Sequence, residues 1–150
     1  MKILQFMLIS TLVLGTAAQA SDVTYRKDIR PLWETQCMAC HGESSPSLAE
    51  FDENKDKYKA LSRGPRMDSY AHLVAFVGWP DTGALMRRLD DGKHTQDGKP
   101  GNMYPYLGSD EDERQKNLAL FKAWVGEDGW VLKRFKELTR EELGEMKVEE

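Results

Sequence analysis

The sequence predicts an all-α fold, and three observations lead to it. Apolar residues recur every three or four positions in several stretches, and helix-capping residues precede these stretches while Gly or Pro follows them. The alternating pattern of a β-strand is almost absent. Residues 21–150, a length of 130 residues, suffice for one domain with one hydrophobic core. We therefore expect short helices joined by long loops.

The first predicted helix covers residues 29–36. Asp28 is its expected N-cap, and Pro31 suits the first turn, where a missing N–H has no intrahelical partner to lose. The apolar face of this helix begins at Ile29 and leads directly into Cys37. The helix therefore positions Cys37 at its C-terminal end.

The middle of the chain predicts three shorter helices separated by breaks. The polar segment 43–67 contains a possible helical piece at 47–61, and periodic apolar residues predict further helices at 69–77 and 82–89. The residues expected to cap the last two are Asp68 or Ser69 and Asp81 or Thr82.

Residues 90–108 show no periodicity and are rich in glycine and proline, which predicts a loop. This loop nevertheless carries Met103, Tyr104 and Leu107. Apolar residues in a loop usually pack over another part of the molecule or over a cofactor. Met103 is therefore a candidate to contact a cofactor.

The C-terminal part predicts one long helix and two short ones. Asp110 and the acidic residues after it form a strong helix start, and Gly126 ends an apolar stripe over residues 111–125. A short helix is expected at 130–138. Thr139 then opens a last amphipathic piece with an acidic, frayed end.

The first twenty residues resemble an export signal. Lys2 precedes an apolar run, and small residues ending in Ala20 predict cleavage before Ser21. The run is short for a membrane span, and no later segment reaches the roughly twenty apolar residues that a spanning helix needs. We expect a protein exported to the periplasm with no membrane span.

The charge argues against some partners. Removal of residues 1–20 takes away one lysine, which leaves 20 basic against 25 acidic residues and a net charge of −5. Nucleic acids and anionic membrane surfaces are poor partners for such a chain.

The cysteine pattern is the most specific feature of the sequence. Cys37 and Cys40 stand three positions apart and His41 follows directly, which is the pattern that attaches a c-type haem. Each thiol can form one thioether bond with the porphyrin, and the imidazole is then held as the proximal ligand of the iron. The motif uses both cysteines of the chain and one of its three histidines.

Two other chemistries use similar residues. A redox disulfide between the cysteines would favour a βαβ setting, for which the chain has no strand pattern. A structural zinc site needs four ligands, and only His72 and His94 could supply a second pair. Both readings are weaker than covalent haem.

With these residues in view, the chain resembles a class I monohaem cytochrome c over about 100 residues. The likeness is carried by the helix running into Cys37, the haem motif, the loop around Met103 and the helix at 110–126. It extends to an Asp-Ile-Arg-Pro-Leu start at 28–32 and an Ala-Trp-Val-Gly-Glu-Asp-Gly end at 123–129, whereas residues 43–79 have no counterpart.

This resemblance implies a cytochrome c-like fold, in which the N- and C-terminal helices cross beside one covalently bound haem c and its iron. We expect a cytochrome c domain at 21–126 and a helical, partly frayed extension at 127–150. The resemblance also implies a distal methionine on a late loop, for which Met103 is the candidate. Met67, His72 and His94 are the rival ligands.

A haem with both axial positions filled has no position for substrate, which favours one-electron transfer over catalysis. We expect a periplasmic electron carrier that meets redox partner proteins as a monomer or in transient complexes. The alternatives are a haem subunit of a larger oxidoreductase and an open-site haem sensor or peroxidase.

Overall fold

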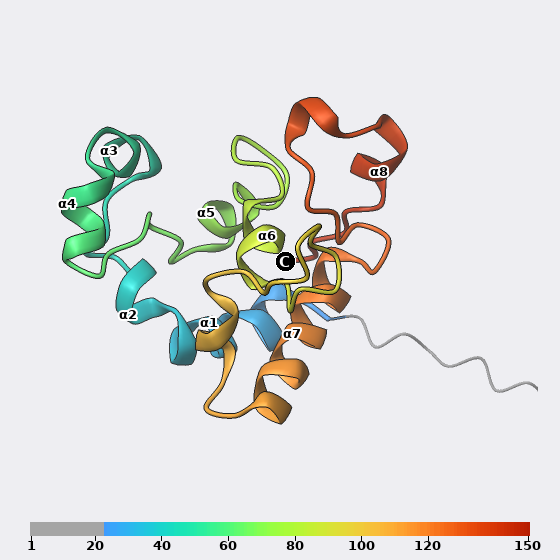
Figure 1. Cartoon of the computed structure of the whole chain (residues 1–150), viewed down its shortest axis with the longest axis horizontal. Coiled ribbons are helices and arrows are strands. Elements are labelled where there is room, and N and C mark those ends of the chain that lie inside the picture. The colour runs from blue at the N-terminus through green and yellow to red at the C-terminus, as the bar shows by residue number, and fades with distance from the viewer. Residues whose placement is uncertain (1–22) are drawn as a thin grey trace, which may run out of the picture.

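The computed structural model describes residues 23–150, and the predicted export signal lies outside them. Within this range the chain forms helices, turns and loops but no β-strand, which confirms the predicted all-α class (Figure 1). No helix in this range is both long and apolar enough to cross a bilayer.

The described chain contains eight α-helices, one π-helical turn and two 3-10 turns. In order, the elements are η1 (Tyr25–Ile29), α1 (Arg30–Gln36), α2 (Met38–His41), α3 (Leu48–Glu53), α4 (Lys55–Ala60), α5 (Tyr70–Val74), α6 (Ala84–Leu89), η2 (Tyr104–Leu107), α7 (Glu111–Val125), η3 (Phe135–Glu137) and α8 (Arg140–Gly144).

The first helical segment begins earlier than predicted. Thr24 is the N-cap, since its hydroxyl accepts a hydrogen bond from the amide of Lys27, and the carboxylate of Asp28 accepts one from the amide of Thr24 at 3.0 Å. The prediction of Asp28 as N-cap was therefore wrong by one turn. Pro31 lies in the first turn of α1, as expected.

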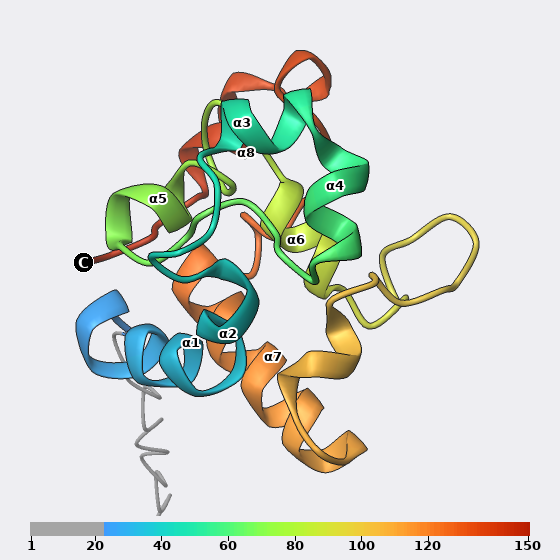
Figure 2. The same ribbon diagram turned by 90° about the vertical axis from the view of Figure 1, so that its left-hand side faces the viewer.

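The long helix α7 and the N-terminal helices form the centre of the core. Trp33 of α1 and Phe121 of α7 meet edge to face, with ring centroids 6.2 Å apart and planes at 77°. Edge-to-face aromatic pairs add stabilisation beyond the area that they bury. This pair confirms that the N- and C-terminal helices pack against each other, as predicted. Ile29, Phe121 and Trp124 are fully buried. Figure 2 shows α1 and α7 side by side.

Helix α7 has the predicted ends. The side chain of Asp110 accepts a hydrogen bond from the amide of Glu113 at 2.9 Å, and Gly126 ends the helix with φ of 97°. A positive φ is readily adopted by glycine, which is why the apolar stripe stops there.

The middle helices follow the predictions, except that α5 covers only Tyr70–Val74 of the predicted 69–77 and that α6 has another cap. The predicted piece at 47–61 forms α3 and α4, which meet at Asn54, and Ser69 caps α5. Helix α6, however, is capped by Gly83 with φ of 72°, and neither Asp81 nor Thr82 caps it. The Thr82 hydroxyl instead donates to the carbonyl of Gly78, and the Asp81 carboxylate pairs with Arg87.

The C-terminal segment is less helical than predicted. Only the 3-10 turn η3 stands where a helix at 130–138 was expected, whereas α8 begins behind the expected cap, Thr139. Trp130 is buried, and its indole N–H donates to the carboxylate of Asp90 at 3.0 Å. This contact directs Trp130 into the core.

The last residues return to the N-terminal part of the domain. The amides of Lys147 and Val148 donate to the carbonyls of Val125 and Trp124, at 2.9 and 3.0 Å, and the carbonyl of Glu149 accepts from Tyr25 at 2.8 Å. The C-terminal residues are thus hydrogen-bonded to the end of α7 and to the start of η1. The predicted domain boundary at residue 126 stays a prediction.

Candidate functional site

The haem motif sits at the end of the first helix. Cys37 ends α1 by donating its amide to the carbonyl of Trp33 at 2.9 Å, and it also precedes α2. The carbonyl of Cys37 accepts from the amides of Cys40 and His41, at 3.1 and 3.0 Å. This turn presents both thiols and the imidazole from a single short helix, with Cys37 half-buried and Cys40 exposed.

Both thiols of the motif are free. Neither is in a disulfide. Burial, and to a smaller extent the neighbouring Cys40, raises the pKa of Cys37 to about 12. The ligand atoms of Cys37, Cys40 and His41 do not lie close enough together to hold one metal ion. Among the described residues, the cluster that could do so is Asp90, Asp91 and His94. The free thiols and this geometry argue against the disulfide and zinc readings.

The ring of His41 is held by a hydrogen bond that it donates to the main chain of Pro65, in the loop after α4. Its Nδ1 lies 2.8 Å from the carbonyl oxygen of Pro65. Because a carbonyl only accepts, Nδ1 carries the proton and Nε2 keeps its lone pair. Burial lowers the pKa of His41, and the Pro65 bond opposes this only in part. The ring is thus a neutral imidazole whose free nitrogen can bind iron.

The segment around Gly64 forms a close cradle for this ring. The amide of Gly64 donates to the carbonyl of Cys40, and the amide of Met67 donates to that of His41, both at 2.9 Å. A Cβ at residue 64 would lie 2.6 Å from Nδ1 and 2.8 Å from Nε2 of His41. Only glycine leaves room for the imidazole here.

Trp33 completes the surroundings of the histidine. Its ring centroid lies 5.9 Å from that of His41, and its buried Nε1 has no hydrogen-bond partner among the described residues. A buried N–H without an acceptor costs free energy, so this atom fits a site that a polar group of a cofactor completes. Together with two free thiols and an oriented imidazole, it fits a covalently bound haem.

Met103 stands on a separate segment that is fastened to α6. Its amide donates to the carbonyl of Arg88 at 2.9 Å, and the amide of Gly101 donates to that of Asp90 at 2.8 Å. The guanidinium of Arg88 also donates to the side chain of Asn102 at 2.9 Å. The Met103 side chain is half-buried against the hydrophobic core. The loop is therefore ordered although it has no regular periodicity.

The rival ligands lie in three other parts of the fold. The amide of Met67 is bonded to the carbonyl of His41. His72 and His94 are exposed, and each directs its Nδ1 to a carboxylate, that of Asp68 at 2.8 Å and that of Asp90 at 2.7 Å.

Sequence reasoning missed three residues that shape the site region. Gly64 and Pro65 were interpreted only as a break between helices, and Asp90 only as part of a loop. Asp90 is fully buried and accepts from Gly92, His94 and Trp130. A Gly-Pro pair after the motif is a weak signal, and nothing in the sequence indicates that an aspartate in a polar run is buried.

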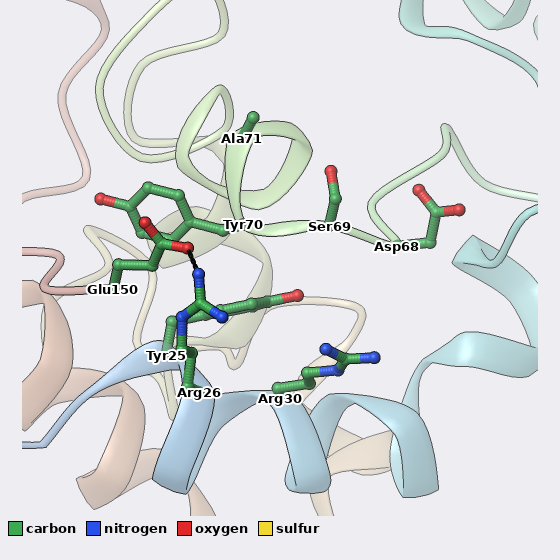
Figure 3. Close-up of a pocket in the computed structure, with 8 residues that line it drawn as sticks. All are labelled: Tyr25, Arg26, Arg30, Asp68, Ser69, Tyr70, Ala71 and Glu150. Atoms are coloured by element: carbon green, nitrogen blue, oxygen red, sulfur yellow. Dashed lines mark hydrogen bonds and ion pairs between the residues drawn. The ribbon is translucent and has the colours of Figure 1, made fainter.

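A surface hollow of about 480 Å³ lies at the N-terminal helix and contains none of the motif residues. Figure 3 shows Tyr25, Arg26 and Arg30 from η1 and α1 on one side, with Tyr70 and Glu150 across from them. Arg26 and Glu150, which both line the hollow, form an ion pair. The cations of this hollow are thus bound to the protein's own acids, since Arg30 also pairs with Glu34.

The comparisons with known proteins agree with this geometry. The family model described as PccH Cytochrome c matches residues 24–150. The solved structure of the monohaem cytochrome PccH from Geobacter sulfurreducens is 53% identical, with a TM-score of 0.80, and the match covers 86% of this chain and 99% of that one. No curated protein matches the chain. The chain therefore belongs to the PccH cytochrome c family, and like the class I monohaem cytochromes it carries one covalently bound haem c and transfers electrons.

Proposed function

We propose that this haem protein is a periplasmic one-electron carrier whose haem is attached through Cys37 and Cys40 and ligated by His41 and Met103. The observation that carries the proposal is the hydrogen bond between Nδ1 of His41 and the carbonyl of Pro65. It leaves Nε2 as the only ring nitrogen able to bind iron, beside two free thiols.

The cysteines have a defined part in attachment. Both thiols would hold the haem, each adding across one vinyl group of the porphyrin, with sulfur bonding to one carbon and the thiol proton passing to the other. Cys37 is half-buried and carries a free thiol. The exposed Cys40 is open to the attachment machinery.

Three observations support Met103 as the distal ligand. Its loop is fastened to α6 by main-chain hydrogen bonds, so the side chain is presented from a fixed segment. Met67 is bonded through its amide to the histidine's own carbonyl, which places its main chain on the proximal side. His72 and His94 are exposed at the surface, whereas Met103 is half-buried against the core.

A haem bound by two protein ligands supplies the gain and loss of one electron and no position for substrate. The residues around it then have only to orient the ligands and exclude water. Trp33, Leu107 and Phe121 are buried on the elements that carry the proposed ligands or pack against them. A site of this kind suits a carrier better than an enzyme.

The periplasmic location is supported by the apolar run and small residues at 3–20, and cytochromes c are typically exported. A freely diffusing carrier is supported by the C-terminus, whose main chain bonds to Trp124, Val125 and Tyr25 of its own domain. A docking arm for a larger complex would be expected to leave these contacts free.

The direct test uses the purified holoprotein. A potentiometric titration is expected to follow a one-electron curve, and the reduced protein is expected to bind carbon monoxide slowly or not at all. Rapid carbon monoxide binding would overturn the carrier proposal in favour of an open-site sensor or enzyme. Fractionation of the expressing cells tests the location, with the haem expected in the periplasmic fraction.

A further inference from the structure

Tyr104, the residue directly after the proposed ligand Met103, is joined to the long helix α7 through its hydroxyl. Only 6% of its surface is exposed. The hydroxyl donates a hydrogen bond to a carboxylate oxygen of Glu111 and accepts one from the side-chain amide of Gln115 at 2.8 Å. A phenylalanine would fill the same space without these bonds, so the hydroxyl adds a directed link between Tyr104 and α7.

The other end of the turn η2 is fastened to the same helix. The side-chain amide of Asn117 donates to the carbonyl of Leu107 at 2.7 Å, and the guanidinium of Arg114 donates to that of Gly108 at 3.2 Å. Leu107 itself is fully buried. Successive turns of α7 therefore hold both ends of η2, and Tyr104 is the contact at the end next to Met103.

The main chain couples Tyr104 to Met103. The amide of Tyr104 donates to the carbonyl of Gly101 at 3.1 Å, and the amide of Tyr106 donates to that of Met103 at 3.0 Å. Consecutive α-carbons are held about 3.8 Å apart by the planar trans peptide, so little freedom remains between these two residues. A shift of Tyr104 relative to α7 therefore moves the α-carbon of Met103 as well.

Helix α7 also supports the segment that carries His41. Phe121 of α7 contacts Trp33, with ring centroids 6.2 Å apart, and the Trp33 ring lies 5.9 Å from that of His41. Tyr104 is bonded to the same helix nearer its N-terminus. One helix thus contacts the elements that carry both proposed axial ligands, and it can fix their relative position.

We infer that Tyr104 is a positioning residue whose hydrogen bond to Glu111 keeps the thioether of Met103 in place as the distal ligand. The inference rests on the proposed function, in which Met103 ligates the iron. A packing role alone needs the ring of Tyr104 and not its hydroxyl. Removal of the hydroxyl should therefore leave the fold intact and make Met103 easier to displace.

The test measures how readily added imidazole displaces the proposed ligand in the oxidised holoprotein. In this exchange a nitrogen of imidazole bonds to the iron as the Met103 sulfur leaves it, and no electron or proton is transferred. The variant is Tyr104→Phe, which removes only the hydroxyl. Tyr70→Phe is the matched control, since it removes a hydroxyl of α5 that donates to the carbonyl of Val148 at 2.8 Å. Tyr106→Phe, at an exposed position of η2 itself, is the second control.

Spectral titration of each protein gives the affinity for imidazole. This affinity is expected to rise roughly tenfold in Tyr104→Phe, because a hydrogen bond to a charged acceptor contributes more than one between neutral groups. Both controls are expected to stay within about twofold of the wild type. An unchanged affinity in Tyr104→Phe would overturn the inference, and so would an equal rise in Tyr70→Phe, because a general loss of stability would then explain the effect.

Glu111 provides a second pair of variants. Its side chain is 59% exposed, so its replacement should not disturb the core. Glu111→Gln keeps an acceptor oxygen for the Tyr104 hydroxyl and is expected to bind imidazole like the wild type. Glu111→Ala removes the acceptor and is expected to bind it as tightly as Tyr104→Phe does. Equal imidazole affinities in the two Glu111 variants would contradict a role for this hydrogen bond.

Proton resonances of the reduced holoprotein test the proposed ligand separately. The methyl protons of a methionine bound to haem iron lie in the ring current of the porphyrin and are shifted strongly upfield. The wild type and Tyr104→Phe are both expected to show this signal, and Met103→Ala is expected to lack it. A signal that persists in Met103→Ala would overturn the proposed ligation. A signal that depends on Met103, together with unchanged imidazole binding by Tyr104→Phe, would overturn only the role of Tyr104.

Discussion

The imidazole of His41 lies against the α-carbon of Gly64, so that a Cβ at residue 64 would come within 2.6 Å of Nδ1. The amide of Gly64 is bonded to the carbonyl of Cys40, which prevents the segment from moving away freely. The histidine is therefore positioned from two directions, by the chain that carries it and by a segment that follows later in the sequence.

The substitution Gly64→Ala should displace the ring of His41. Overpacking of this kind costs roughly 1–3 kcal/mol of unfolding free energy. We also expect a shift of the reduction potential and of the haem absorption bands, because the hydrogen bond from Nδ1 to the Pro65 carbonyl should lengthen. Thermal unfolding and potentiometry measure both. Gly144→Ala is the matched control, since a Cβ at residue 144 meets nothing within 4 Å; equal changes in both variants would contradict the cradle.

Each cysteine of the motif should contribute one thioether link. Cys37→Ala and Cys40→Ala are expected to weaken haem staining after denaturing electrophoresis, and the double variant should lose it, because no other cysteine exists in the chain. Ala39→Ser keeps both thiols and should stain like the wild type. Full staining of the double variant would show that the haem is not attached through this motif.

The buried carboxylate of Asp90 should make stability depend on acid pH. Burial alone would raise its pKa, but hydrogen bonds from Trp130, His94 and Gly92 outweigh burial and hold the pKa below the ordinary value of 3.8. Because the folded state binds the proton less readily than the unfolded chain, this stabilisation is present above pH 3.8 and is lost as the pH falls through the lower folded value. Denaturant titrations from neutral pH down to acid should show the loss.

The variant Asp90→Asn should lose roughly 1–3 kcal/mol of unfolding free energy at neutral pH, since donors that faced a carboxylate lose an acceptor. Its stability should also vary less with pH than that of the wild type. Asp128→Asn, at an exposed position, is the control and should behave like the wild type. A pH dependence unchanged by Asp90→Asn would mean that other carboxylates are responsible.

The sequence was sufficient to predict the elements whose evidence is local. Helix α7 was predicted because its cap, apolar stripe and terminal glycine lie within one continuous stretch, and the haem motif because its residues are contiguous. The cap of α6 could not be predicted, because Thr82 and Asp81 are taken by Gly78 and Arg87. These contacts exist only after folding.

The residues of the site likewise fall into those that local spacing identifies and those that only the fold brings together. Cys37 and His41 could be identified from spacing, but the partner of the imidazole, Pro65, lies 24 residues later and is brought there by the fold. The predicted helix at 130–138 failed for a similar reason, since the Trp130 side chain is bonded to Asp90, 40 residues earlier. Long-range side-chain contacts of this kind leave no periodic signal.

The substitution Met103→Ala tests the proposed distal ligand. The haem should stay attached through Cys37, Cys40 and His41, while the sixth position opens, so the reduced variant should bind carbon monoxide rapidly. Its reduction potential should fall, because water or hydroxide replaces a ligand that favours ferrous iron. Its stability should drop as well, because a bond to iron would restrain a loop whose ordering is entropically costly. Met67→Leu preserves the volume of the rival side chain and should bind carbon monoxide as slowly as the wild type. The reverse result, with rapid binding by the Met67 variant and slow binding by the Met103 variant, would assign the iron to Met67.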